Sequence, residues 1–270
     1  MYYDYYGFKE PPFNITPDPK YLFFSEQHRE ALNYLLYGIR ERKGFIQLTG
    51  EVGAGKTTIC RAFFNELDHD TITGLILNPM LSETQLLRAI LRELEVPGER
   101  HDRLSNYELL NDFLLEKLEE KRDVVLVLDE AQDLSHAMLE MVRLLSNLET
   151  DNRKLVQIVL MGQPELREKL NNPALRQLRQ RITVRYHLDP LDEDETRRYI
   201  EHRMTIAGGR GVPWFDKGAI RRIYRYSGGI PRMINAITDK SLLAGYVRHK
   251  DHITAGMVRD AEKEMEGYEQ

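Results

Sequence analysis

The sequence predicts an α/β fold in which an open parallel sheet of five strands lies between helices, followed by a small domain of four helices. Two observations support this fold class. Short apolar runs typical of buried parallel strands alternate with amphipathic helical patterns. Beyond Pro190 only helical patterns remain. We therefore expect an α/β domain at 1–190, in which 1–44 is an N-terminal segment with a leading helix, and a helical domain at 191–270.

The elements of the first domain follow in regular order. A helix is expected at 25–41, before the first strand. The strands are Phe45–Thr49, Thr71–Leu77, Asp123–Leu128, Leu155–Met161 and Ile182–Leu188. Between them, capping boxes at Ser82–Gln85 and Ser105–Glu108 open two helices, because each pairs a Ser with a Gln or Glu three residues later. A further helix is expected at 137–148.

A complete phosphate-binding loop, or P-loop, follows the first strand. The pattern GxxxxGK, then Ser or Thr, is spelled by Gly50, Glu51, Val52, Gly53, Ala54, Gly55, Lys56 and Thr57, and Thr58 continues into a helix. Glycines let successive backbone N–H groups turn toward a phosphate, and the helix N-terminus adds its positive end. Lys56 is expected at the β- and γ-phosphates and Thr57 on Mg²⁺. The loop therefore predicts ATP and Mg²⁺ as ligands.

Two acidic residues follow the strand Asp123–Leu128. Asp129, at the carboxyl end of this strand, is expected to hold Mg²⁺ through its water shell, since this small cation keeps waters and takes few carboxylates. Glu130 comes next and is expected to act as the general base that polarises the attacking water. The combination with the P-loop predicts an enzyme that hydrolyses ATP.

The helical domain contains a third motif. Asp192 and Glu195 cap its first helix, which reaches Ala207, and further helices are expected near 215–226, 232–247 and 254–266. Between two of these helices, a Gly–Gly turn and Pro231 fix Arg232 in the first helical turn. An arginine held there can contact the γ-phosphate, so Pro231 and Arg232 are expected at the nucleotide.

Composition and charge narrow the class of protein. The 270 residues contain no apolar run long enough to span a membrane, no signal segment at Met1 and one cysteine, Cys60, so we expect a cytoplasmic protein in which Cys60 packs. The net charge is −5, yet 174–260 hold seventeen Lys or Arg and ten Asp or Glu. Head-to-tail assembly of subunits, a basic lane for nucleic acid and scattered solvated charges all remain open as explanations.

The assembled motifs resemble the AAA+ ATPases, with Arg232 at their sensor 2 position. A closer similarity is to the general secretion pathway protein A (ExeA-like) family, over nearly the whole chain. It is carried by the opening 5–19, by 25–37, and by GEVGAGKTT, LDEAQ, MGQPEL, LRQLRQRI and GGIPRMIN. The resemblance implies an ATPase that helps to assemble the outer-membrane secretin of type II secretion. Many members continue into a transmembrane helix and a peptidoglycan-binding domain. We expect either a stand-alone relative or the cytoplasmic part of a longer protein, peripheral at the inner membrane through a partner or a further segment.

The resemblance also implies further site residues. Gln163 falls at sensor 1, and Asn78 falls where some AAA+ proteins restrain the catalytic glutamate. Arg181 is the first candidate for an arginine finger that reaches the ATP of a neighbouring subunit, with Arg176 and Arg179 as alternatives. Such a finger would make an oligomer, either a ring or a helical filament, the active form.

The aromatic N-terminus allows two interpretations. By resemblance, Phe8, Pro12 and Phe13 line an adenine pocket. Alternatively, Tyr2, Tyr3, Tyr5 and Tyr6 cover the edge of the sheet domain.

Two functions from different classes stay open. One is an assembly ATPase that acts on a protein partner. The other is an ATP-dependent switch or loader on duplex DNA, such as a transposition regulator. The short link at 78–82 and the absence of a winged-helix pattern after the fourth helix favour the assembly ATPase, whereas the basic region 174–260 keeps DNA possible.

Overall fold

The computed structural model describes residues 2–14, 18–77, 81–150, 153–209 and 211–267. The chain forms two compact units. The sheet unit comprises His28–Gly50 and Ile59–Leu188, and the helical unit comprises Met1–Gln27, Glu51–Thr58 and Asp189–Gln270. The P-loop segment therefore packs with the helical unit, although both of its ends continue into the sheet unit.

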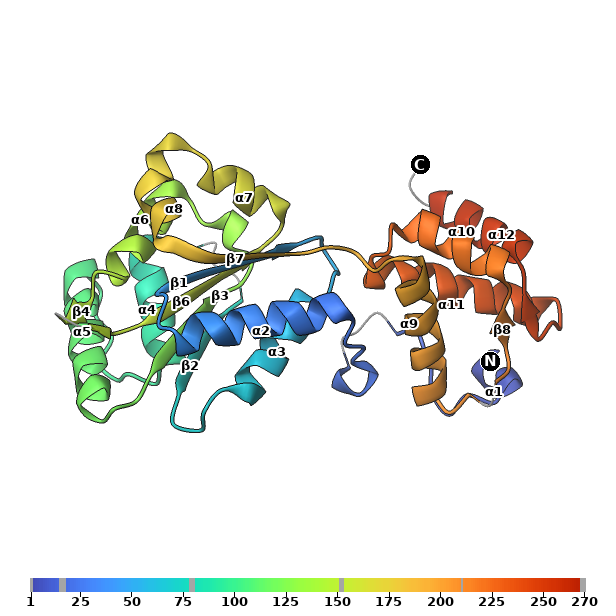
Figure 1. Ribbon diagram of the computed structural model, residues 1–270, viewed down its shortest axis with the longest axis horizontal. Coiled ribbons are helices and arrows are strands. Elements are labelled where there is room, and N and C mark those ends of the chain that lie inside the picture. The colour runs from blue at the N-terminus through green and yellow to red at the C-terminus, as the bar shows by residue number, and fades with distance from the viewer. Residues whose placement is uncertain (1, 15–17, 78–80, 151–152, 210, 268–270) are drawn as a thin grey trace. The chain divides into compact units, whose positions relative to one another are not determined.

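A five-stranded parallel sheet forms the sheet unit, as the sequence predicts (Figure 1). Its strands are β1 (Phe45–Gly50), β2 (Ile72–Ile76), β3 (Val124–Leu128), β6 (Gln157–Gly162) and β7 (Ile182–Leu188), in the order β2-β3-β6-β1-β7. The inner strands β1, β3 and β6 are buried along their whole length, whereas the edge strand β7 has exposed positions. All five strands point the same way, so β1, β3 and β6 have their carboxyl ends on the same side of the sheet.

Helices cover both faces of this sheet (Figure 1). These helices are α2 (Glu26–Arg40), α3 (Lys56–Glu66), α4 (Glu83–Glu93), α5 (Arg103–Glu119), α6 (His136–Leu145), α7 (Pro164–Leu170) and α8 (Arg176–Arg181). The chain between them also forms the 3-10 turns η2 (Ala131–Asp133) and η3 (Pro173–Leu175) and a small antiparallel pair of strands, β4 (Glu149–Thr150) and β5 (Arg153–Lys154). Along β1 the side chains alternate between faces. Phe45 joins the core with α4, α5 and α6, whereas Ile46 lies so close to α2 that a Cβ on Gly38 would be 2.4 Å from its Cδ1.

The two predicted capping boxes of the sheet unit have different outcomes. Ser82 and Gln85 form theirs, with the Ser82 Oγ accepting from the Gln85 N–H at 3.3 Å and the Gln85 Oε1 accepting from the Ser82 N–H at 2.8 Å. The box predicted at Ser105 is wrong, because α5 begins earlier, at Arg103. Asp102 is its N-cap, and its Oδ1 accepts from the Ser105 N–H at 2.8 Å. A carboxylate also suits the positive helix end, which favours the earlier start.

The helical unit is built on four C-terminal helices, as predicted. They are α9 (Glu193–Ile206), α10 (Lys217–Ser227), α11 (Pro231–Val247) and α12 (Ala255–Glu266), and Asp192 with Glu195 forms the expected capping box of α9. A parallel pair of two-residue strands, β8 (Trp214–Phe215) and β9 (His252–Ile253), joins the loops before α10 and α12.

The N-terminal segment packs with these helices rather than with the sheet. Helix α1 (Tyr2–Tyr6) contacts α11, and the turn η1 (Pro19–Tyr21) contacts α9. Tyr2 and Tyr6 belong to the core of the helical unit, and the Tyr6 hydroxyl donates to the Lys250 carbonyl at 2.9 Å. The expectation that the first tyrosines cover the edge of the sheet is therefore wrong, because their rings find an apolar core and backbone acceptors in the helical unit.

No helix among the residues that the structure describes combines the length and the apolar character that crossing a membrane requires.

Candidate nucleotide-binding and hydrolysis site

The P-loop has the backbone that its glycines permit. Gly53 and Gly55 have φ of 81° and 104°, which residues with a Cβ rarely adopt. Lys56 is buried, and its Nζ donates to the Glu51 carbonyl at 3.0 Å. The Ala54 N–H donates to the same carbonyl, at 3.1 Å. The loop is thus closed on itself, with the Lys56 ammonium held against its backbone.

The residues predicted to hold Mg²⁺ offer hard oxygen ligands. Thr57 is exposed in the first turn of α3, and Asp129 is buried directly after β3. A hydroxyl and a carboxylate suit Mg²⁺, which keeps several waters and takes its remaining ligands from substrate phosphates. Within the described ranges, no three His, Cys, Asp or Glu side chains form a group that could hold a metal ion. Each of the two residues thus offers an oxygen of the kind that Mg²⁺ accepts beside nucleotide phosphates.

Arg232 lies directly against the P-loop. A Cβ on Gly53 would be only 2.5 Å from the Arg232 Cβ and 3.3 Å from its Cδ. Pro231 is the first residue of α11 and Arg232 the second. Among the described residues Arg232 has no ion-pair partner. The start of α11 thus brings an uncompensated positive charge to the loop that is expected to bind phosphates.

The turn before α11 is fixed by the chain that leaves the sheet. Gly229 has φ of 76°, and a Cβ there would be 1.9 Å from the Leu191 carbonyl oxygen. The Leu191 N–H donates to the Gly229 carbonyl at 3.0 Å. The second glycine of this turn is therefore required by a close backbone approach, and the approach determines where Arg232 stands.

The acidic pair after β3 is held by the backbone around it. The Asp129 N–H donates to the Ile76 carbonyl at the end of β2, at 2.9 Å, and the Asp129 Oδ1 accepts from the Glu130 N–H, also at 2.9 Å. Glu130 itself has left-handed backbone angles, φ 51° and ψ 38°. That conformation costs a non-glycine residue about 1–2 kcal/mol, and such strain concentrates at functional sites.

The Glu130 carboxylate is bound by two glutamine amides. Its Oε2 accepts from the Gln163 Nε2 at 3.1 Å and from the Gln132 Nε2 at 2.7 Å. Gln163 follows β6 and is the N-cap of α7, so the pairing of β3 with β6 brings it beside Glu130. The sequence analysis did not identify Gln132 as a site residue, although its position two residues after Glu130 in LDEAQ was the available signal.

Cys60 packs on α3, as expected. Its side chain is buried, and burial together with the nearby Asp129 carboxylate raises the pKa of the Cys60 thiol to about 12. The raised pKa keeps the thiol protonated at neutral pH.

The candidate arginine fingers differ in their surroundings. Arg181 is engaged with α6, since its Nη1 donates to the Ser146 Oγ at 2.6 Å and to the Arg143 carbonyl at 3.4 Å. Arg176 is exposed. Arg179 is half-buried, and its Nη1 donates to the Asn171 Oδ1 at 3.2 Å.

Arg179 also lines a polar cavity of about 250 Å³ in the sheet unit. Arg167 on α7 and Arg185 on β7 line the same cavity, as does Gln47, which is buried on β1. Within the part of the chain that the structure describes, none of these three arginines forms an ion pair with an Asp or Glu. The cavity therefore gathers positive charge that no carboxylate neutralises.

The aromatic residues expected at the adenine are core residues in this structure. Phe13 is 2% exposed, and the Arg203 guanidinium lies over its ring at 6.0 Å. Phe8 is also buried, and the Arg203 Nε donates to the Pro12 carbonyl at 2.6 Å. The ring of Phe13 thus presents almost no surface to an adenine base. Asn78, the other residue carried over by resemblance, lies outside the described residues.

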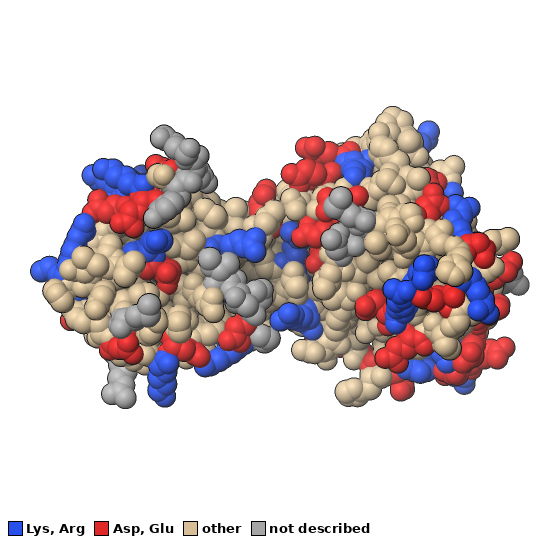
Figure 2. Space-filling view, turned by 180° about the vertical axis from the view of Figure 1, so that it is seen from behind, with Lys and Arg blue, Asp and Glu red and all other residues tan. Residues whose placement is uncertain are grey.

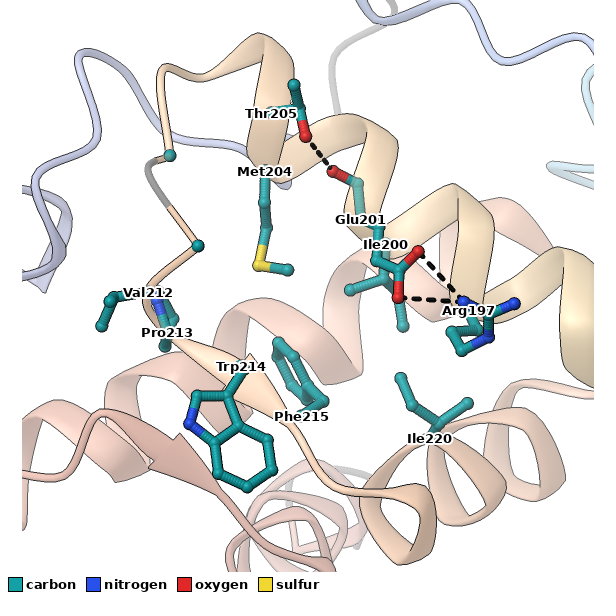
Figure 3. Close-up of a pocket in the computed structure, with 12 residues that line it drawn as sticks. Arg197, Ile200, Glu201, Met204, Thr205, Val212, Pro213, Trp214, Phe215 and Ile220 are labelled. Atoms are coloured by element: carbon teal, nitrogen blue, oxygen red, sulfur yellow. Dashed lines mark hydrogen bonds and ion pairs between the residues drawn. The ribbon is translucent and has the colours of Figure 1, made fainter.

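A second cavity, of about 270 Å³, lies within the helical unit between α9 and β8 (Figure 3). Met204 and Phe215 point toward its apolar part, and an ion pair of Arg197 with Glu201 lies at its rim. None of the predicted nucleotide-site residues lines it, so it is separate from the P-loop.

Comparison with known proteins agrees with this geometry. A family model described as "AAA domain" matches residues 39–170. General secretion pathway protein A of Aeromonas hydrophila is 48% identical over 269 residues, which cover 99% of this chain and 49% of that protein. The chain thus spans about half the length of this curated relative.

Similar solved structures share the fold at low identity. The ORC2 protein of Aeropyrum pernix, in ADPNP–ADP complexes, superposes with a TM-score of 0.66 at 17% identity, over 95% of this chain and 71% of that one. The RuvB Holliday junction branch migration motor of Thermotoga maritima superposes with a TM-score of 0.58 at 21% identity, over 89% of this chain and 69% of that one. Drosophila ORC bound to DNA superposes with a TM-score of 0.67 at 17% identity, over 94% of this chain and 64% of that one. With its P-loop and its acidic pair, the chain has the P-loop fold of the AAA+ ATPases and resembles general secretion pathway protein A over nearly its whole length.

Proposed function

We propose that this ATPase hydrolyses ATP between the subunits of an oligomer and thereby drives assembly or remodelling of a partner complex of the secretion type, with the secretin as the assembled product. The observation that carries the proposal is the 48% identity along 99% of the chain to general secretion pathway protein A. We propose a cytoplasmic location, at the inner membrane through a partner or a further segment.

In the proposed reaction, the P-loop amides and Lys56 would hold the phosphates, and Thr57 and Asp129 would hold Mg²⁺, which when bound would neutralise charge on the phosphates. Glu130 accepts a proton from the attacking water. The hydrogen bond from Gln163 to Glu130 supports a role for Gln163 in aligning this base rather than in contacting the phosphate alone. Phe13 stays the proposed adenine contact, and this role requires its ring to leave the core.

Pro231 and Arg232 are proposed to sense the γ-phosphate. The contact of Arg232 with Gly53 supports this role, because it places the cation beside the phosphate-binding backbone without an acidic partner among the described residues. Loss of the γ-phosphate would remove the anion that Arg232 neutralises. The helical unit would then respond to the nucleotide state.

For the arginine finger we propose Arg179 in place of Arg181. The guanidinium of Arg181 already donates to Ser146 and Arg143, whereas Arg179 lines the cavity with Arg167 and Arg185. A phosphate presented by a second subunit would meet uncompensated positive charge there.

A DNA-bound switch is the second candidate function, and the same arginine cavity favours it. Two observations weigh against it. The net charge of the chain is −5. Moreover, among the described residues Lys and Arg side chains are interspersed with Asp and Glu on the face of each unit that Figure 2 shows. Non-specific DNA affinity depends on a continuous basic lane.

The test measures the ATPase rate and the particle size of the wild-type chain with and without duplex DNA across a salt series. Assembly driven by ATP and indifferent to DNA is the expected result. Stimulation that requires DNA and weakens steeply as salt rises would replace the assembly ATPase by the DNA switch.

A second arm tests the position of the finger. Arg179→Ala is expected to keep ATP binding and to lose roughly a thousand-fold in rate. Mixing it with Lys56→Ala should restore activity, because the Lys56→Ala subunits supply intact fingers. Arg176→Ala is the matched control, since it removes an exposed arginine of the same helix and should stay active. If mixing restores nothing, Arg179 does not act across the interface.

A further inference from the structure

The Gln132 amide connects two parts of the hydrolysis site. Its Oε1 accepts from the Gln163 backbone N–H at 3.0 Å, and its Nε2 donates to the Glu130 Oε2 at 2.7 Å. The orientation of this amide is unambiguous, because a backbone N–H can only donate and an ionised carboxylate can only accept. Gln132 therefore bridges the start of α7 to the carboxylate proposed as the base.

Gln132 is itself held from two further directions. The Lys169 Nζ on α7 donates to the Gln132 carbonyl and, at 2.9 Å, to the Leu134 carbonyl, which fixes the turn η2. At the end of β6, Gly162 leaves room for the amide, since a Cβ there would be 2.7 Å from the Gln132 Oε1. The last residue of β6 and helix α7 thus both contact Gln132 in the turn after β3.

A second side-chain amide binds the same carboxylate oxygen of Glu130 as Gln132 does. The Gln163 Nε2 also donates to the Glu130 Oε2, at 3.1 Å, so two amides fix one carboxylate oxygen. The glutamate side chain that they hold starts from a left-handed backbone at Glu130. A left-handed backbone directs the side chain differently than a helical or an extended backbone would. The hydrogen bonds from the two side-chain amides and the backbone conformation therefore act together on the position of the carboxylate.

We infer that Gln132 is a positioning residue for ATP hydrolysis, which holds Glu130 and Gln163 in one arrangement without touching the nucleotide. The inference rests on the proposed role of Glu130 as the base. In that reaction the water oxygen bonds to the γ-phosphorus while its proton passes to Glu130. The bond from this phosphorus to the β–γ bridging oxygen breaks, and its electron pair leaves with ADP. A carboxylate that is not held in line with the attacking water accepts this proton less efficiently.

The experiment measures kcat, KM and nucleotide affinity of the full chain for Gln132→Ala and Gln132→Glu. Both variants should lower kcat about ten- to a hundred-fold, the size typical of residues that orient a reacting group, with ATP affinity changed by less than about two-fold. Gln132→Glu keeps the side-chain volume and the acceptor for the Gln163 N–H but cannot donate to Glu130. It separates the two ends of the bridge.

A double-mutant cycle distinguishes positioning from a general structural role. If Gln132 acts through Glu130, Gln132→Ala should lower kcat in the wild-type background and leave it unchanged in the Glu130→Gln background. An equal loss in both backgrounds, or a loss in ATP affinity instead of kcat, would overturn the inference. A kcat of Gln132→Ala equal to wild type would also overturn it.

Two further variants keep the test decisive. Gly162→Ala leaves every donor in the chain but pushes the Gln132 amide aside, so it should reproduce the loss in kcat even if Gln132→Ala fails to fold. Gln157→Ala is the matched control, because it removes a glutamine of β6 that is buried away from Glu130, with its Nε2 donating to the Ile39 carbonyl at 3.0 Å, and it should keep kcat. Near-normal turnover of Glu130→Gln would instead refute the proposed base, whatever the Gln132 variants show.

Discussion

Gly53 meets two requirements that only a residue without a side chain satisfies. Its φ is 81°, and the Arg232 Cβ would lie 2.5 Å from a Cβ on Gly53. The P-loop pattern explains the backbone angle. It does not explain the contact with α11, which belongs to the tertiary structure and links the loop to the arginine proposed as a sensor.

The Gly53→Ala variant separates these two requirements when it is compared with Gly98→Ala. Gly98 has φ of 89° and open space around it, so its substitution introduces backbone strain alone, about 1–2 kcal/mol. Gly53→Ala adds overpacking of about 1–3 kcal/mol and should also weaken ATP binding. Urea unfolding and nucleotide titration measure both quantities. Equal losses for the two variants would show that the contact with Arg232 contributes nothing.

Sequence could reveal some site residues and not others for a physical reason. The P-loop and the pair Asp129 and Glu130 follow strands, and their chemistry is local to one segment. The role of Gln132 depends on Gln163, thirty-one residues later, and on the pairing of β3 with β6. A single sequence gives the order of strands along the chain but not which strands pair, so this bridge could not be predicted.

At the scale of an element, the N-cap residue Asp102 determines where helix α5 begins and contributes to its stability. Asp102→Ala removes the carboxylate that accepts from the Ser105 N–H and should lower stability by about 1 kcal/mol. Ser105→Ala keeps that backbone donor and should change stability by less than about 0.5 kcal/mol. Thermal unfolding of both variants measures the difference. The opposite ranking would restore the start predicted at Ser105.

Glu99, in the connection between α4 and α5, makes a pH-dependent contribution to the stability of the folded state. Hydrogen bonds from Arg92 and then Arg88 lower the pKa of Glu99 to about 2, from an ordinary value of 4.5. The folded state therefore binds the proton less readily than the unfolded state. The stabilisation is complete above about pH 4.5 and is lost as the pH falls toward 2.

Unfolding of the wild type and of Glu99→Gln as a function of pH tests this assignment. The melting temperature of the wild type should exceed that of the variant above about pH 4.5, and the two should converge in more acidic solution. A difference that persists unchanged at pH 2 would exclude Glu99 as the source.

The sheet elements also show where sequence patterns suffice. The five main strands have five to seven residues each, and all five were predicted. The pairs β4–β5 and β8–β9 have two residues in each strand, too few for a periodic pattern. The β8–β9 pair also depends on contact between two loops that lie far apart in the chain.

Among the described residues, each of the two units has a hydrophobic core of its own. The change of pattern near residue 190 predicted where the helices begin. It could not predict that Met1–Gln27 and Glu51–Thr58 would join them, because those contacts connect distant parts of the chain.

Two cores predict two unfolding transitions. Trp214 is the single tryptophan of the chain and stacks on His252 at 3.8 Å in the helical unit. Its fluorescence should therefore report that unit alone, whereas circular dichroism reports both, and the two urea midpoints should differ. ATP at a hundred times its Kd should stabilise the bound state by about 2.7 kcal/mol and move the Trp214 midpoint. Coincident midpoints without ATP would contradict the prediction.

The division of the chain into units has a topological consequence. The backbone passes from one unit to the other four times, after Gln27, Gly50, Thr58 and Leu188. A protease that cuts only between Leu188 and Asp189 leaves the larger fragment with two pieces of the helical unit still attached, including the P-loop. Such a nicked molecule should stay together on a gel-filtration column and separate only in denaturant. A truncated chain that ends at Leu188 would keep every residue of the phosphate-binding motif and lose the helices against which that motif is packed.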